Sequence, residues 1–189
     1  PCITKQSSGL FPPRKRRKKP LHFMLEGSNM EKKIMEILDQ IAKDPDNNHW
    51  TDKKWSFRIK SEIAKIGKQQ HFWVYGAQAE NVDDGEWLYD LVWLSYQGNT
   101  LINVNLLLES EWTPTNMYDD FQKLLLGRSE LKVMIFYSSS VSHFKENINR
   151  MKNEIQSFKY SMPGDKYLLS GYVNEMGEFS HENYIHKNL

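Results

Sequence analysis

The stretch that most constrains the fold of this chain runs from Gly85 to Trp112. It contains two long apolar segments separated by a Gln-Gly-Asn triplet at positions 97–99. Glycine in such a separator tolerates the positive φ that a tight chain reversal needs. We therefore predict a β-hairpin of two strands, Glu86–Tyr96 and Thr100–Trp112, at the centre of the fold.

Three acidic residues interrupt the apolar strands of this hairpin. Asp90 lies within the first strand, and Glu109 and Glu111 close the second. Because side chains alternate between the two faces of a strand, Glu109 and Glu111 are expected on one face. Leu107, Asn105 and Asn103 should share that face, while Ile102, Val104, Leu106 and Leu108 take the other.

These acidic residues have two interpretations. Carboxylates that are buried close together repel one another, and such a cluster is best stabilised by a hard cation, which takes oxygen ligands. Alternatively, Asp90 pairs with a basic residue, and the two glutamates lie at a solvated strand end.

Length and cysteine content limit the class of protein. A chain of 189 residues is one domain, or one domain with a tail. Cys2 is the only cysteine, which excludes an intrachain disulfide and a cysteine zinc site. No apolar run approaches the roughly 18 residues of a membrane span, and no secretory signal pattern is visible. We therefore expect a cytoplasmic protein with no membrane association.

The net charge of +1 conceals an asymmetry between the first 29 residues and the remainder. Residues 1–29 carry seven Lys or Arg and one Glu, and the remainder carries 18 basic and 23 acidic residues, a net charge of −5. The main part of the chain is therefore not broadly basic. Binding of nucleic acid would require a local basic strip or metal ions.

Residues 1–29 are predicted to form a separate, flexible tail, and residues 30–189 a single domain. The basic run at 13–20 is typical of a nuclear-import or phosphate-binding patch. The alternative, which we favour, is that the tail derives from an expression tag and that the native chain starts at Met30. We assign the tail no function.

Apolar periodicity predicts the remaining elements. Helices are expected over Met30–Lys43, Thr51–Gly67 and Asn116–Leu126 and from about Ser142 onward, and strands over His71–Ala77, Leu131–Tyr137, Lys166–Val173 and Glu178–Ile185. The last helix has apolar residues at the spacing of core residues or of a seam between the two copies of a homodimer, namely Phe144, Ile148, Met151, Ile155 and Phe158.

Three polar residues on these helices bear on the site. Glu62 lies beside the apolar stripe of the second helix and therefore needs a partner. Either it forms a salt bridge with Arg58, or it faces the strand carboxylates. On the third helix, Gln122 lies at the border of the apolar stripe. Lys123 is expected to point away from it.

The order helix, strand, strand, strand, helix, strand over roughly Thr51–Tyr137, with its acidic residues, resembles the PD-(D/E)XK nuclease superfamily. The resemblance implies an α/β fold of the restriction-endonuclease-like type, a mixed sheet flanked by helices with core order αβββαβ. Asp90 matches the metal-binding aspartate of the family, and Glu109-Ser110-Glu111 matches its (D/E)-X-K element. Glu62 and Gln122 resemble a glutamate and a glutamine on the flanking helices of many members.

This resemblance implies a magnesium ion held by Asp90, Glu109 and the carbonyl of Ser110. Glu111 would orient or deprotonate the attacking water, and Glu62 would hold that water or a second ion. Glu111 stands where lysine is usual, as in a minority of restriction enzymes that carry Glu-X-Glu, so the identity of the general base stays open.

Two function classes follow from these observations. The first is magnesium-dependent hydrolysis of phosphodiester bonds in nucleic acid, in DNA rather than RNA. The second is a catalytically inactive, nuclease-like fold that serves as a binding or assembly module. The departure at Glu111 and the acidic main part of the chain both favour the second class.

Overall fold

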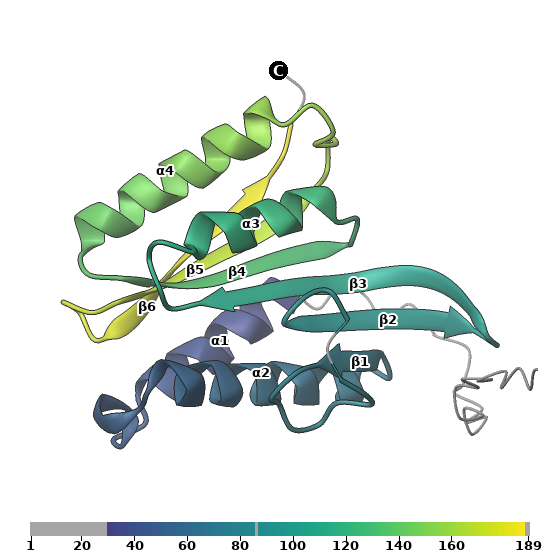
Figure 1. The fold of residues 1–189 in the computed structure, drawn as a ribbon, viewed down its shortest axis with the longest axis horizontal. Helices are drawn as coiled ribbons and strands as arrows, with labels where there is room; N and C mark the ends of the chain where they lie inside the picture. The colour runs from purple at the N-terminus through teal and green to yellow at the C-terminus, as the bar shows by residue number, and fades with distance from the viewer. Residues whose placement is uncertain (1–29, 86, 188–189) are drawn as a thin grey trace, which may run out of the picture.

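A computed structural model describes residues 30–85 and 87–187 of the chain (Figure 1). The predicted tail at 1–29 and Glu86 of the first predicted hairpin strand lie outside these residues. Within the described ranges, no helix combines the length and the apolar character that crossing a membrane requires.

The described chain is an α/β fold with four α-helices, one short 3₁₀ helix and six strands. The elements in chain order are α1 (Met30–Ala42), η1 (Asn47–His49), α2 (Asp52–Gln69), β1 (Trp73–Gly76), β2 (Leu91–Gln97), β3 (Thr100–Glu111), α3 (Met117–Leu126), β4 (Leu131–Ser138), α4 (Val141–Ser157), β5 (Lys166–Val173) and β6 (Glu178–Ile185).

The six strands form one mixed sheet in the order β1-β2-β3-β4-β5-β6. The β1–β2, β2–β3 and β5–β6 pairs are antiparallel, and β3–β4 and β4–β5 are parallel. Both predicted hairpins are confirmed as antiparallel neighbours. The parallel pairs require crossover connections, which α3 and α4 supply.

Helices cover both faces of the sheet, with α1 and α2 on one side and α3 and α4 on the other (Figure 1). The α2 helix starts where the sequence predicts, because the Thr51 side chain accepts a hydrogen bond from the Lys54 backbone N–H at 3.4 Å. Its apolar stripe of Trp55, Ile59 and Ile63 is buried against the sheet. The helix then continues past the predicted end at Gly67 to Gln69.

On the opposite face, the four periodic residues of α4 are buried within this chain. They pack in one cluster with side chains of α3 and of the strands beneath. The core interpretation of Phe144, Ile148, Met151 and Ile155 is thereby confirmed. A homodimer remains a prediction that would need another surface.

The first strand of the central hairpin was predicted too long at its N-terminal end, because β2 begins at Leu91 and not at Glu86. Since β1 has only four residues and pairs Gly76 with Leu91, the described residues 87–90 have no strand-pairing partner on β1. In addition, the Asp90 carboxylate accepts the Ser110 backbone N–H, which ends the ladder with β3. Leu88, with φ of 69° and 77% exposure, lies in a loop.

The predicted side-chain alternation along β3 is also interrupted, because the β2–β3 register shifts between Trp93 and Leu94 and again between Ser95 and Tyr96. Trp93 pairs with Leu106 and the next residue, Leu94, pairs with Val104, so that Asn105 forms a bulge. Val104 therefore packs on the α3–α4 side with Leu107, whereas it was predicted to share a face with Leu106. Beyond the bulge, the predicted alternation from Leu106 to Glu111 is maintained.

Gly67 provides a test of how closely α2 approaches the sheet. A Cβ at this position would lie 2.6 Å from the Trp93 side chain and 2.8 Å from that of Val74. Gly67→Ala should therefore lower the free energy of unfolding by about 1–3 kcal/mol through overpacking, against the usual gain from alanine in a helix.

Gly85→Ala is the matched control, because a Cβ there would meet no atom within 4 Å. Its stability should stay within about 0.5 kcal/mol of the wild-type value. Thermal and denaturant unfolding would measure both changes. A stabilised Gly67→Ala protein would contradict the close approach of α2 to β2.

Candidate functional site

The predicted acidic residues meet where β2 begins and β3 ends. Because Leu91 pairs with Leu108 across the antiparallel strands, the next residues outward, Asp90 and Glu109, are neighbours. Asp90 Oδ2 accepts a hydrogen bond of 2.9 Å from the backbone N–H of Ser110. The hairpin register therefore brings together Asp90 and the Glu109-Ser110-Glu111 segment, as the sequence predicted.

Asp90 also forms an ion pair with a lysine of α2. Lys60 Nζ lies 3.3 Å from Asp90 Oδ1, and the Lys60 side chain is only 6% exposed. The salt-bridge interpretation of Asp90 is therefore confirmed. Lys60 could not be identified from the sequence, because a lysine in the buried part of a helix carries no motif that indicates its partner.

Glu109 is the most deeply buried carboxylate of the site, with a side chain that is 2% exposed. Burial raises its pKa to about 8, and the nearby charge of Asp90 adds to the rise, against the lowering effect of Lys123. The Lys123 ammonium lies 2.8 Å from Glu109 Oε1, but Oε1 accepts no well-aligned hydrogen bond from any described residue. Glu109 therefore keeps an incompletely satisfied buried oxygen.

Lys123 belongs to the site, contrary to the prediction that it points away. Its Nζ lies between Glu109 and Asp120, 2.8 and 2.9 Å from their carboxylates. Burial lowers the pKa of Lys123, but its close contacts with the two negative carboxylates outweigh that effect and leave the pKa above its ordinary value. The prediction failed because it used the direction of the Cβ, and a long lysine side chain can turn back across its helix.

Glu111 follows Glu109 by two residues and lies on the same face of β3 as Glu109. Its Oε1 accepts a hydrogen bond of 2.6 Å from the Thr113 backbone N–H. This contact fixes the turn that leads from β3 into α3. Glu111 is partly buried and contacts the chain through a backbone donor, so its charge is held near the strand end.

Glu62 is neutralised by residues of its own helix. Arg58 Nη1 and Lys65 Nζ lie 3.2 and 3.7 Å from its carboxylate, which is 25% exposed. The Arg58 interpretation of Glu62 is confirmed. No contact between Glu62 and Asp90 or Glu109 is found among the described residues.

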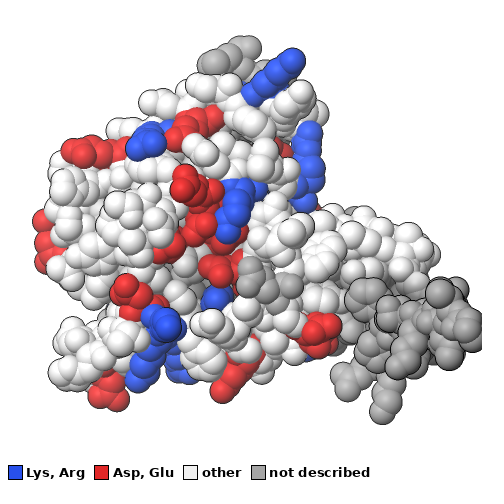
Figure 2. All heavy atoms as spheres, in the orientation of Figure 1, with Lys and Arg blue, Asp and Glu red and all other residues white. Residues whose placement is uncertain are grey.

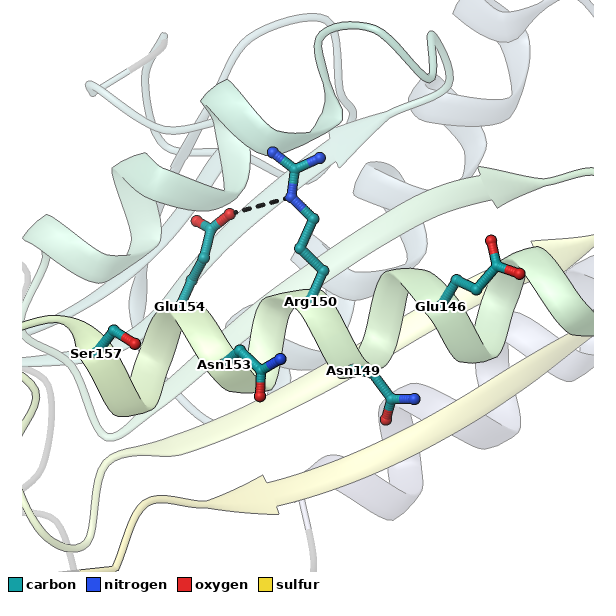
Figure 3. A pocket seen from close by; sticks show the side chains of 6 residues that line it. All are labelled: Glu146, Asn149, Arg150, Asn153, Glu154 and Ser157. Carbon is teal, nitrogen blue, oxygen red and sulfur yellow. Dashed lines mark hydrogen bonds and ion pairs between the residues drawn. The ribbon is translucent and has the colours of Figure 1, made fainter.

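Gln122 points from α3 toward α4, and its amide donates a hydrogen bond of 3.2 Å to Glu154. Glu154 belongs to a shallow polar hollow along α4, in which it also pairs with Arg150 (Figure 3). The hollow is lined by Glu146, Asn149, Arg150, Asn153, Glu154 and Ser157. Gln122 therefore contributes to helix–helix contact, and the strand carboxylates do not line this hollow.

Charges of both signs alternate across the site. Figure 2 shows acidic and basic side chains side by side over α3 and the strand ends beneath it. Asp90 and Glu109 each contact one lysine, from α2 and α3 respectively. We call Asp90, Glu109, Lys60 and Lys123 the paired carboxylate site.

The donor atoms of this site fit magnesium by their chemistry. Two carboxylates and the Ser110 carbonyl are hard oxygen donors, and Glu109 has the incompletely satisfied oxygen described above. In the present arrangement, no three acidic, histidine or cysteine side chains of the described residues converge as a metal-binding group. An ion would therefore be held by Asp90, Glu109 and main-chain oxygen rather than by a third carboxylate.

Comparison with protein-family models, with curated proteins and with solved structures gave no match. The resemblance to the PD-(D/E)XK superfamily therefore stays a prediction, carried by the residues and the geometry above.

The raised pKa of Glu109 predicts a pH-dependent stability. The folded protein retains a proton on Glu109 that the unfolded chain releases from about pH 4.5, so this contribution is complete below about 4.5 and is lost as pH rises through about 8. Glu109→Gln keeps the shape without the titration. Its thermal midpoint should depend less on pH and should exceed that of the wild type at alkaline pH.

Glu111→Gln serves as the control, because Glu111 accepts a backbone N–H at a less buried position. It should reproduce the wild-type change of midpoint with pH between 5 and 9. If the thermal midpoint depends on pH in the same way in the wild type and in Glu109→Gln, Glu109 is not the titrating group.

Proposed function

We propose that this protein is a magnesium-dependent nuclease of the PD-(D/E)XK type, which hydrolyses phosphodiester bonds in nucleic acid, DNA rather than RNA. The observation that carries the proposal is the buried Glu109 beside Asp90 at the adjoining ends of β3 and β2. Charge of this kind, buried at a strand end and with a shifted pKa, is characteristic of functional sites. The order α2-β1-β2-β3-α3-β4 supports a restriction-endonuclease-like core.

The residues of the site suit this reaction. Asp90, Glu109 and the Ser110 carbonyl would hold the magnesium ion, which when bound neutralises charge on the phosphate and lowers the pKa of bound water. Glu111, fixed by the Thr113 N–H, would accept a hydrogen bond from the attacking water and orient it. A role for Glu62 in holding the water or a second ion is less well supported, because its carboxylate already pairs with Arg58 and Lys65.

A local basic strip supports nucleic acid as the substrate. The exposed side of α2 carries Lys53, Lys54, Arg58 and Lys65, which we call the α2 basic ridge. Figure 2 shows a group of basic side chains toward one end of α2, with acidic side chains beside it, on the same face as the charged group over α3. In a domain that is otherwise acidic, this ridge is where a phosphate backbone would bind while its scissile bond lies at the carboxylates.

A second candidate function is a nuclease-like binding or assembly module without catalysis. The ion pairs themselves favour it, because Lys60 and Lys123 already neutralise the two carboxylates that would bind the metal. In such a module, the ion pairs would be permanent structural contacts that join helices on opposite faces to the same strand ends.

Plasmid cleavage with magnesium, with and without EDTA, separates the two functions. For a nuclease, we expect cleavage that EDTA abolishes and that Glu109→Gln reduces by about 100-fold or more. Because this substitution should preserve folding, its loss of activity would not reflect unfolding. Glu154→Gln, on α4, is the control and should cleave like the wild type.

An uncut plasmid under all magnesium conditions, with a protein whose midpoint shows it to be folded, would favour the binding module. Cleavage by Glu109→Gln at the wild-type rate would contradict the assignment of the site.

The α2 basic ridge predicts salt-dependent binding. Lys54→Ala should weaken binding of duplex DNA uniformly across sequences and reduce the slope of log K against log salt by about one. Fluorescence anisotropy in EDTA, between about 50 and 200 mM salt, would measure this without cleavage. Lys145→Ala, at an exposed position on α4, is the matched control. If Lys54→Ala and Lys145→Ala give the same slope of log K against log salt, the phosphate contacts do not lie on the α2 basic ridge.

A further inference from the structure

Lys123 contacts Glu109, the most deeply buried of the proposed cation ligands, just as Lys60 contacts Asp90. The Lys123 ammonium contacts Glu109 Oε1 at 2.8 Å and Asp120 Oδ1 at 2.9 Å. Glu109 Oε1 is also the buried oxygen that lacks an aligned hydrogen bond. A divalent cation bound to Glu109 and the ammonium therefore require the same oxygen.

We propose that the Lys123 ammonium is the resident counter-ion of Glu109 in the metal-free protein and that a divalent cation must displace it to bind. The inference rests on the proposed function, since it takes Glu109 as a ligand of the cation. It goes beyond that function by naming the residue that sets the affinity of the site.

The charges of the site explain why the two cations exclude each other. At a pH above the pKa of Glu109, Asp90, Glu109 and Asp120 supply three negative charges, and Lys60 and Lys123 supply two positive charges. A magnesium ion added to this group, with both lysines in place, would produce a net positive charge in a largely buried position. Release of one lysine restores the balance.

Exposure identifies Lys123 as the lysine that leaves. Its side chain is 43% exposed, whereas that of Lys60 is 6% exposed. Asp120, one turn earlier on α3 and 23% exposed, already contacts the ammonium and can retain it as it moves toward solvent. Lys60 has no comparable route, because its displacement would leave a buried ammonium without its carboxylate.

Lys123→Met tests the proposal, since it keeps an unbranched side chain that is only one atom shorter and removes the charge. Calorimetric titration with Mn²⁺ alone, at one pH above the pKa of Glu109 and without nucleic acid, would give the Kd for the metal. We expect the Kd to fall about tenfold or more, because the metal no longer displaces a charged partner. Lys152→Met, which removes the α4 partner of Glu182, should leave the Kd unchanged.

The double variant Glu109→Gln/Lys123→Met locates the effect. It should lose the tighter binding if the metal binds Glu109. Equal Kd values for the wild type and Lys123→Met, weaker binding by Lys123→Met, or binding by neither protein would overturn the proposal. If Lys123→Met fails to fold, Lys123→Gln takes its place, with the same expected result.

Plasmid cleavage, measured separately, distinguishes the failure of this inference from the failure of the proposed function. Tighter Mn²⁺ binding by Lys123→Met without cleavage by either protein would support the counter-ion role and reject the nuclease. Cleavage by the wild type together with an unchanged Kd would support the nuclease and reject the counter-ion role.

Discussion

The burial of the Glu109 carboxylate on β3 is the constraint on which the candidate site depends. Glu109 pairs with Met134 of β4 just beyond the end of the β2–β3 ladder, and its side chain is buried there beneath Lys123 of α3. A carboxylate in such a position requires a proton or a cation. The seating of α3 supplies the cation as Lys123, and docking of this helix is thereby coupled to the charge of the site.

The same strand end is also held from the opposite face. Lys60 of α2 pairs with Asp90, and Asp90 in turn accepts the N–H of Ser110 on β3. Helices from the two layers therefore converge on two adjacent carboxylates, each bringing one ammonium group. A change of charge at either carboxylate would alter the contact between the sheet and one helix layer, so cation binding and stability are linked.

Much of this arrangement follows from local sequence. Turn residues at 97–99 and 174–177 define both hairpins, and the register of the first places Asp90 beside Glu109. The beginning of β2 could not be predicted from its own residues, because the length of a strand depends on its partner, and β1 is short. Lys60 and Lys123 escaped prediction for another reason. Helical periodicity gives the direction of a Cβ, but not where the end of a long, flexible side chain lies.

The two proposed functions differ in the fate of one ion pair. In a binding module the Lys123–Glu109 contact is permanent, whereas in a nuclease it is the resting state of a cation site. The raised pKa of Glu109 bears on this choice, because it shows that Lys123 does not fully compensate for the burial of the carboxylate. A divalent cation brings twice the charge and can bind both Asp90 and Glu109. The ion pair therefore leaves part of the cost of burial uncompensated. A proton on Glu109 relieves that cost below about pH 8, and above it a metal ion bound to both carboxylates would relieve it in place of the ammonium.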